Sequence, residues 1–148
     1  MALIAVEGCR ICFECDAGWS WKGWDGKLTV RRGSGQTTAG GHRLVLFPDV
    51  IALQAQFAGH QYAAQGYEDT PGGVASALIS VEGESLSPTL SDEGAPAVTA
   101  KTKGSFQVSC TPPSFRAGSP PVPDPLASMH TGKWRVEDPA QGLVGDDV

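Results

Sequence analysis

The four cysteines are the residues of this sequence best suited to a defined chemistry. Cys9, Cys12 and Cys15 form a C-x2-C-x2-C run, and Cys110 follows far downstream. A loop with two-residue spacing can turn successive thiolates toward one centre, and a [4Fe–4S] cluster can take three ligands from such a loop and a fourth from elsewhere. The pattern predicts a metal centre bound by these four cysteines, and it favours a [4Fe–4S] cluster as the cofactor.

Zinc is the direct alternative for the same ligands. Four thiolates bind zinc tetrahedrally, although structural zinc sites usually consist of two separated C-x2-C pairs. A histidine can replace one sulfur, and His130 is the best single substitute. Disulfides and unligated core thiols are the remaining alternatives, and a Cys9–Cys12 disulfide would be strained. Whichever metal binds, we expect it to stabilise the fold rather than to carry electrons.

The other residues that could do chemistry form no catalytic pattern. His42, His60 and His130 are not spaced as H-x-H or H-x3-H. The sequence has no G-x-S-x-G motif, and the glycines at 33–35 lack the lysine of a phosphate-binding loop. We therefore expect no enzyme activity and no small-molecule substrate. The net charge of −5 and the pI near 5.0 also argue against a nucleic-acid partner, because such proteins need clustered Lys and Arg.

The elements that must position the cysteines are predicted to be mainly β-strands. The 148 residues include 19 Gly and 11 Pro, and short apolar runs separated by glycines favour β structure. The length fits one small domain over residues 1–148. One short helix is expected near 48–58, where Pro48 and Asp49 suit a helix start. Strands are predicted at 2–7, 27–32, 42–47, 74–81, 97–103, 105–110, 132–137 and 141–144, with a hairpin turn at Gly104.

Two segments are predicted to lie outside the strands. Residues 9–26 combine three of the cysteines with Trp19, Trp21 and Trp24, and show no clean period. We expect a cysteine- and tryptophan-rich loop whose indole rings pack over the metal. Residues 111–125 carry six prolines and are expected to form an extended surface connector that cannot lie inside a sheet.

Two short segments share a similar residue pattern. Gly104–Val108 and Gly132–Val136 each run from a glycine through two residues and an outward polar or basic residue to a valine. Both have the character of a strand. This similarity is too short to indicate a solenoid repeat.

The first residues predict a cytoplasmic origin. The apolar start is interrupted by Glu7 and Arg10, and it lacks the basic region and cleavage site of a signal peptide. No apolar run reaches the roughly 20 residues of a membrane helix. We expect synthesis in the cytoplasm, where thiols stay reduced.

Both ends of the sequence resemble a known family. The opening Ala5-Val-Glu-Gly-Cys9, the glycine-containing β segments and the closing Gly132-Lys-Trp-Arg-Val-Glu-Asp-Pro-Ala-Gln-Gly-Leu-Val144 resemble the PAAR-like spike-tip proteins of contractile tails. These proteins occur in phage baseplates, type VI secretion systems and extracellular injection systems. The Pro-Ala-Ala-Arg signature is missing, and 95–98 is only a fragment of it. The family's usual zinc ligands, three histidines and one cysteine, are not visible at comparable positions.

The resemblance implies a structural function. The protein would form the membrane-piercing apex of a phage tail or injection machine, as a virion component of the tail or baseplate. Its partners would be a trimeric spike or baseplate hub protein and, transiently, the target cell envelope. The four cysteines would then stabilise a small pointed domain, since a metal that binds only the folded state adds to its stability. The alternative is a small iron–sulfur electron-transfer protein.

Overall fold

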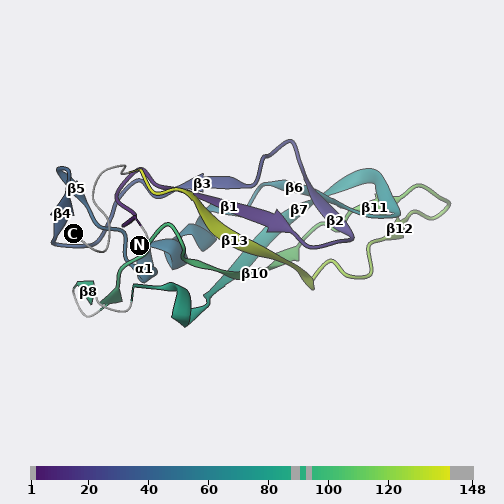
Figure 1. Cartoon of the computed structure of the whole chain (residues 1–148). Helices are drawn as coiled ribbons and strands as arrows, with labels where there is room; N and C mark the ends of the chain where they lie inside the picture. The colour runs from purple at the N-terminus through teal and green to yellow at the C-terminus, as the bar shows by residue number, and fades with distance from the viewer. Residues whose placement is uncertain (1–2, 88–90, 93–94, 141–148) are drawn as a thin grey trace.

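Short strands dominate the part of the chain that the computed structural model describes, residues 3–87, 91–92 and 95–140. They build a body that is longer than it is wide (Figure 1). The strands are β1 (Arg10–Cys15), β2 (Trp19–Lys22), β3 (Lys27–Thr29), β4 (Thr38–Ala39), β5 (His42–Arg43), β6 (Gln61–Ala64), β7 (Tyr67–Val81), β8 (Ser91–Asp92), β9 (Ala95–Pro96), β10 (Lys103–Cys110), β11 (Phe115–Arg116), β12 (Val122–Pro123) and β13 (His130–Asp138). The helical segments are α1 (Phe47–Ile51), η1 (Ala52–Gln56) and η2 (Gly83–Ser85). No helix among the described residues is long and apolar enough to cross a bilayer.

Nine of these strands form one curled antiparallel sheet. Its order is β12-β11-β7-β10-β13-β1-β3, and β6 pairs with both β7 and β2. Side chains alternate strictly between the two faces along β10 and β13, as the period of two in a strand requires. The inner face encloses the core, and the outer face carries the polar residues. The predicted fold class, a small mainly β domain with one short helix, is confirmed.

The similar residue pattern of 104–108 and 132–136 has a structural explanation. The two segments lie side by side in β10 and β13, and the antiparallel register places Gly104 opposite Trp134 and Phe106 opposite Gly132. A Cβ atom on Gly104 would overlap the Ser80 carbonyl and the Trp134 indole, and one on Gly132 would overlap the Phe106 ring. Each glycine therefore leaves room for the aromatic ring of the other segment.

Some strands begin, end or turn at residues other than those predicted. Gly104 is not a turn residue, because it lies inside β10 and is needed as a strand residue without a side chain. The chain turns earlier, where the Thr102 N–H donates to the Thr99 carbonyl at 3.1 Å. Of the strands expected at 2–7 and 97–103, the described residues 3–7 and 97–102 form only isolated bridges, such as Ile4 with Thr99. The segment 141–144 lies outside the described residues.

Residues 9–26 are not an irregular loop. They contain β1 and β2, and β1 is a central strand between β13 and β3. Ile11 and Phe13 face the core, as period two demands, but Cys12 is also buried, on the outer face. Cys12 points outward between the inward Ile11 and Phe13, yet all three residues are apolar. The sequence therefore lacks the alternation of apolar and polar residues by which a strand is recognised.

The proline-rich segment 111–125 is not wholly outside the sheet. It contains β11 and β12, and Phe115 of β11 pairs with Thr70 of β7. Pro123 is tolerated because β12 is the outermost strand of the sheet. No strand lies beyond it that would need a hydrogen bond from the backbone N–H that proline lacks.

The short helix lies where it is predicted, and its second half is a 3₁₀-helix. Asp49 stabilises the start by accepting a hydrogen bond from the Leu46 N–H at 2.8 Å. Val50, Leu53 and Phe57 are buried on one side. Gln54 interrupts this apolar side because its Oε1 accepts the Ile79 N–H of β7 at 2.6 Å.

Aromatic rings fill the centre of the curled sheet. Phe13 makes edge-to-face contacts with Phe57 and Phe106, at centroid distances of 4.8 and 5.5 Å. Trp19 and Trp21 of β2 donate their indole N–H groups to the carbonyls of Thr131 and Phe13, at 2.8 and 2.9 Å. These bonds join β2 to β13 and β1, with which it forms no strand pairing in the described structure. The tryptophans therefore close the core of the described structure.

Candidate functional site: four thiols and a buried Tyr–Asp–His network

The structure does not bring the four cysteines to one centre. Cys9 and Cys110 are buried in the main core and Cys15 packs against it, whereas Cys12 is on the opposite face of β1. Residues three apart in a strand point to opposite faces, and Cys12 and Cys15 are also about 10 Å apart along the chain by strand rise. Within the ranges described, no three His, Cys, Asp or Glu side chains are grouped to hold a metal ion.

As placed, the thiols do not fit a four-thiolate iron–sulfur or zinc site. C-x2-C spacing directs sulfurs toward one point in a loop but to alternate faces in a strand. A shared centre would require β1 to leave its register between β3 and β13. The [4Fe–4S] and zinc centres stay predictions from the spacing alone.

The protonation of the thiols follows from their burial. Burial raises the pKa of Cys9, Cys15 and Cys110 to about 12. It also raises the pKa of Cys12, against the opposing effect of the Arg135 charge. At neutral pH these side chains are thiols, which are weak nucleophiles compared with thiolates.

His130 lies in a different polar site from the one predicted for it. Its Nε2 is 2.6 Å from Asp124 Oδ2, and both side chains are almost completely buried. The same carboxylate oxygen accepts the Tyr62 hydroxyl at 2.7 Å, and the Leu126 N–H donates to Oδ1 at 2.9 Å. A carboxylate can only accept hydrogen bonds, so His130 must donate from Nε2. The three side chains form a buried network, called here the Tyr62–Asp124–His130 network.

The network fixes the proline-rich segment to the body of the protein. The Tyr62 hydroxyl accepts the Ser114 N–H at 3.0 Å, and the Ser114 hydroxyl accepts the Ala64 N–H at 3.2 Å. Asp124 also donates its own N–H to the Ser114 carbonyl at 2.8 Å. Both strands of the β11–β12 hairpin are thereby held at their base. Trp19 stacks on the His130 ring at a centroid distance of 5.0 Å and keeps water away.

The charge of Asp124 is stabilised by these partners. Burial by itself would raise the pKa of Asp124, but the hydrogen bonds from His130, Leu126 and Tyr62 outweigh it and lower the pKa below its ordinary value. Burial raises the pKa of Tyr62 well above its usual range, so this phenol stays a donor. The arrangement is a satisfied structural network.

Little in the sequence indicates this network. Tyr62 lies in a short apolar run and Asp124 lies between prolines, where an acidic residue normally marks an exposed turn. Of the three residues, His130 alone is a candidate from the sequence, and then for metal binding. The signal that could identify Asp124 is its place in a proline-rich segment that needs an anchor.

No protein-family model matches the chain, and no curated protein is significantly similar to it.

Proposed function

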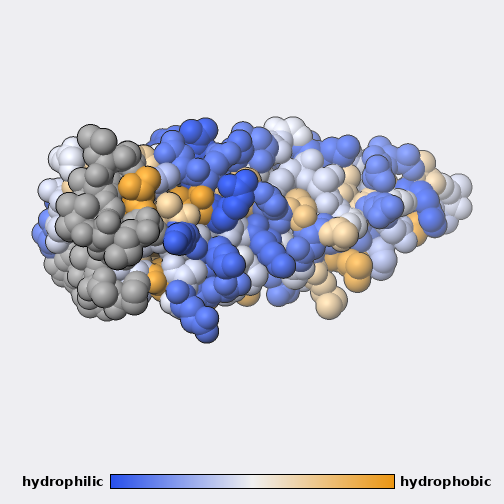
Figure 2. Space-filling model, viewed as in Figure 1, coloured by the Kyte–Doolittle hydropathy of each residue, from blue (hydrophilic) through white to orange (hydrophobic). Residues whose placement is uncertain are grey.

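We propose that this protein is a structural tip component of a contractile phage tail or injection machine, seated on a trimeric spike or hub protein. The observation that carries the proposal is the construction of the narrow end of the molecule. The body tapers toward the β11–β12 hairpin (Figures 1 and 2). The Tyr62–Asp124–His130 network holds the base of that hairpin rigidly.

Rigidity at a narrow end is what a piercing apex needs. Prolines restrict the backbone of the hairpin, and buried charge-assisted hydrogen bonds resist its displacement. The interlocked glycine–aromatic pairs of β10 and β13 stiffen the body behind it. The similarity of both sequence ends to PAAR-like spike tips supports the same function.

The metal centre expected from the spacing is not needed for this proposal. The hydrogen-bonded network and the aromatic core support a rigid body without reference to a metal. The electron-transfer alternative depends entirely on a cluster, and the placement of Cys12 and Cys15 on opposite faces of β1 favours the structural function over it.

The test is co-expression with a trimeric spike protein of a contractile tail, followed by size-exclusion chromatography with light scattering. We expect one copy per spike trimer. A Gly-Ser insertion after Gly118, in the β11–β12 connection, should leave the complex intact because the narrow end points away from the spike. The same insertion after Gly40, in the β4–β5 turn of the broad end, should prevent assembly.

Two results would contradict the proposal. The first is the absence of any complex with the wild-type chain, and the second is an assembly that is blocked by the Gly118 insertion alone. Iron, acid-labile sulfide and zinc are quantified in the same anaerobically purified sample. Stoichiometric metal would show that β1 does not keep its register between β3 and β13.

A further inference from the structure

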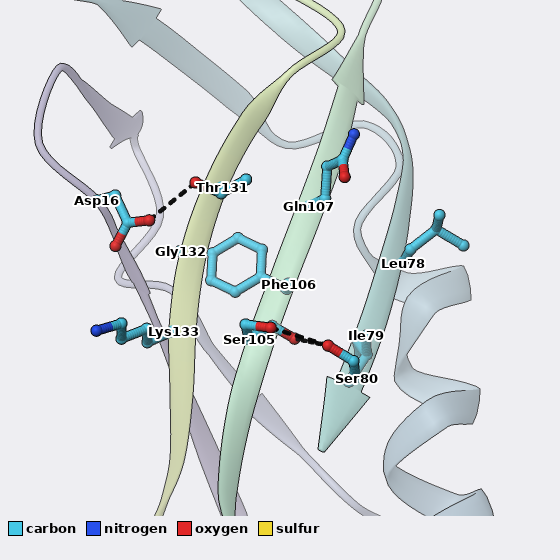
Figure 3. Close-up of a pocket in the computed structure, with 10 residues that line it drawn as sticks. All are labelled: Asp16, Leu78, Ile79, Ser80, Ser105, Phe106, Gln107, Thr131, Gly132 and Lys133. Carbon is cyan, nitrogen blue, oxygen red and sulfur yellow. Dashed lines mark hydrogen bonds between the residues drawn. The ribbon is translucent and has the colours of Figure 1, made fainter. Parts of the chain in front are cut away.

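The outer face of the curled sheet carries a polar groove. A hollow of about 340 Å³ lies across β7, β10 and β13. Its residues are Asp16, Leu78, Ile79, Ser80, Ser105, Phe106, Gln107, Thr131, Gly132 and Lys133 (Figure 3). Smaller hollows of about 100 and 210 Å³ continue it toward Glu82 and Arg135 and share Lys133 with it. The hollows together suit an extended ligand better than a compact one.

The polar groups of the groove are held in place. The Ser80 and Ser105 hydroxyls are 2.8 Å apart, and the Thr131 hydroxyl donates to Asp16 Oδ2 at 2.8 Å (Figure 3). Gln107 donates from Nε2 to the Ser128 carbonyl at 3.4 Å, so its Oε1 is oriented as an acceptor. Groups that are ordered before binding lose less entropy when a ligand arrives.

Two formal charges of opposite sign border the groove without an ionic partner. Lys133 has no carboxylate partner and Asp16 no cationic partner in the described part of the chain, whereas the neighbouring Arg135 pairs with Glu14 at 3.2 Å. In Figure 3 both side chains extend from the same side of the groove. The pair offers one strong donor and one strong acceptor.

One exposed apolar side chain, that of Leu78, lines the groove, and two more lie in the segment that leads into β13. Leu78, Leu126 and Met129 are 68%, 52% and 65% exposed. Leu78 is the cross-strand partner of Gln107, and Gln107 also binds the carbonyl next to Met129. Figure 2 shows hydrophobic side chains beside the start of β13, on a surface that is otherwise largely hydrophilic.

This combination matches the chemistry of a sugar. Each sugar hydroxyl both donates and accepts, so carboxylate, ammonium, amide and hydroxyl groups can all be used at once. The C–H face of the ring suits the exposed Leu78 side chain. A phosphate or an acidic peptide would be repelled by Asp16, and an acyl chain would leave the polar groups without partners. A peptide strand cannot pair here, because the backbone groups of this sheet face are already used within the sheet.

We propose that this groove binds a neutral saccharide chain. Asp16 and the Gln107 Oε1 accept hydrogen bonds from sugar hydroxyls, Lys133 donates to sugar oxygens, and Leu78 contacts an apolar ring face. The inference does not depend on the function as a spike tip.

The experiment is titration of the ¹⁵N-labelled wild-type chain with a panel of neutral gluco-, xylo-, manno- and chito-oligosaccharides. Uronate oligosaccharides and inorganic phosphate serve as anionic probes. We expect saturable amide shifts for at least one neutral oligosaccharide, concentrated at Ser105, Gln107 and Thr131. Asp16→Asn should weaken that binding at least tenfold, because an amide still accepts from Thr131 but is a poorer acceptor for the sugar.

Three further variants separate the alternatives. Gln107→Ala should also weaken neutral binding, whereas Glu68→Gln, an exposed change on β7 outside the groove, should have no effect. Lys133→Met should affect neutral binding less than Asp16→Asn does. The proposal is overturned if no neutral oligosaccharide shifts the groove amides, or if Asp16→Asn leaves the affinity unchanged. Binding of the anionic probes alone, abolished by Lys133→Met, would also overturn it and identify an anion site.

Discussion

A single buried carboxylate organises the polar interior of this protein. Asp124 accepts three hydrogen bonds, from His130, Tyr62 and the Leu126 N–H, and it is almost inaccessible to water. Buried charges are tolerated when all of their hydrogen-bonding positions are used. At the scale of residues, the stability of the narrow end therefore depends on hydrogen-bond donors that cannot be replaced by water.

Removal of the Tyr62 hydroxyl tests this dependence. Tyr62→Phe leaves the Ser114 N–H without its acceptor and removes one donor from Asp124. We expect the free energy of unfolding to fall by about 1–3 kcal/mol, the usual cost of unpaired buried polar groups. Urea denaturation followed by tryptophan fluorescence measures it.

Tyr67→Phe is the matched control, since Tyr67 is only half-buried and contacts the Arg116 guanidinium through its ring. It should change stability by less than about 0.5 kcal/mol, as surface substitutions usually do. Equal losses in the two variants would contradict the importance of the network.

At the scale of elements, β10 and β13 are held in register by mutual complementarity. The glycine of each strand faces the aromatic ring of the other, and the Trp134 indole N–H reaches the Ser80 carbonyl of β7 at 2.8 Å. A shift of one residue would turn the rings to the outer face. The register is thus specified by shape as well as by hydrophobicity.

Filling these spaces should be costly. Gly104→Ala places a Cβ against the Ser80 backbone and the Trp134 ring, and Gly132→Ala places one against Phe106 and the Glu14 carbonyl. We expect each variant to lose about 1–3 kcal/mol or more of unfolding free energy, as overpacked cores do. Thermal and urea unfolding give the values.

Gly83→Ala is the control for the glycine variants, because a Cβ at this position would have no heavy atom within 4 Å and the φ of Gly83 is not positive. It should be neutral or slightly stabilising, since alanine reduces the entropy of the unfolded chain. A neutral Gly104→Ala would show that the strands can separate without cost.

At the scale of the whole molecule, stability should depend on pH in two separate ranges. Burial beneath Trp24 lowers the pKa of His60, so the unfolded chain binds a proton first and stability falls as the pH drops below 6.5. The pKa of Asp124 is lowered below 3.8. The stabilisation of the fold by the ionised Asp124 carboxylate is therefore fully present above pH 3.8, and it is lost as the pH falls through the folded-state pKa of Asp124.

Comparison with Asp124→Asn isolates the lower range. The difference in unfolding free energy between wild type and this variant should be constant from neutral pH to about pH 5 and should shrink below pH 3.8. Urea unfolding at a series of pH values measures it. Asp25→Asn, at an exposed position, is the control. A difference that stays constant down to pH 2 would show that Asp124 has no stabilised charge.

The mainly β class, the short helix after Pro48 and several strands could be predicted from the sequence alone, because period-two alternation and glycine punctuation act locally. The tertiary structure, by contrast, sets where Cys9, Cys12 and Cys15 lie, since the same spacing directs sulfurs to one point in a loop and to opposite faces in a strand. It also decided the role of Gly104, which depends on Trp134 in a distant segment. The Tyr62–Asp124–His130 network likewise could not be predicted from the sequence. Tyr62 is 62 positions from Asp124, and the two side chains meet only in the folded sheet.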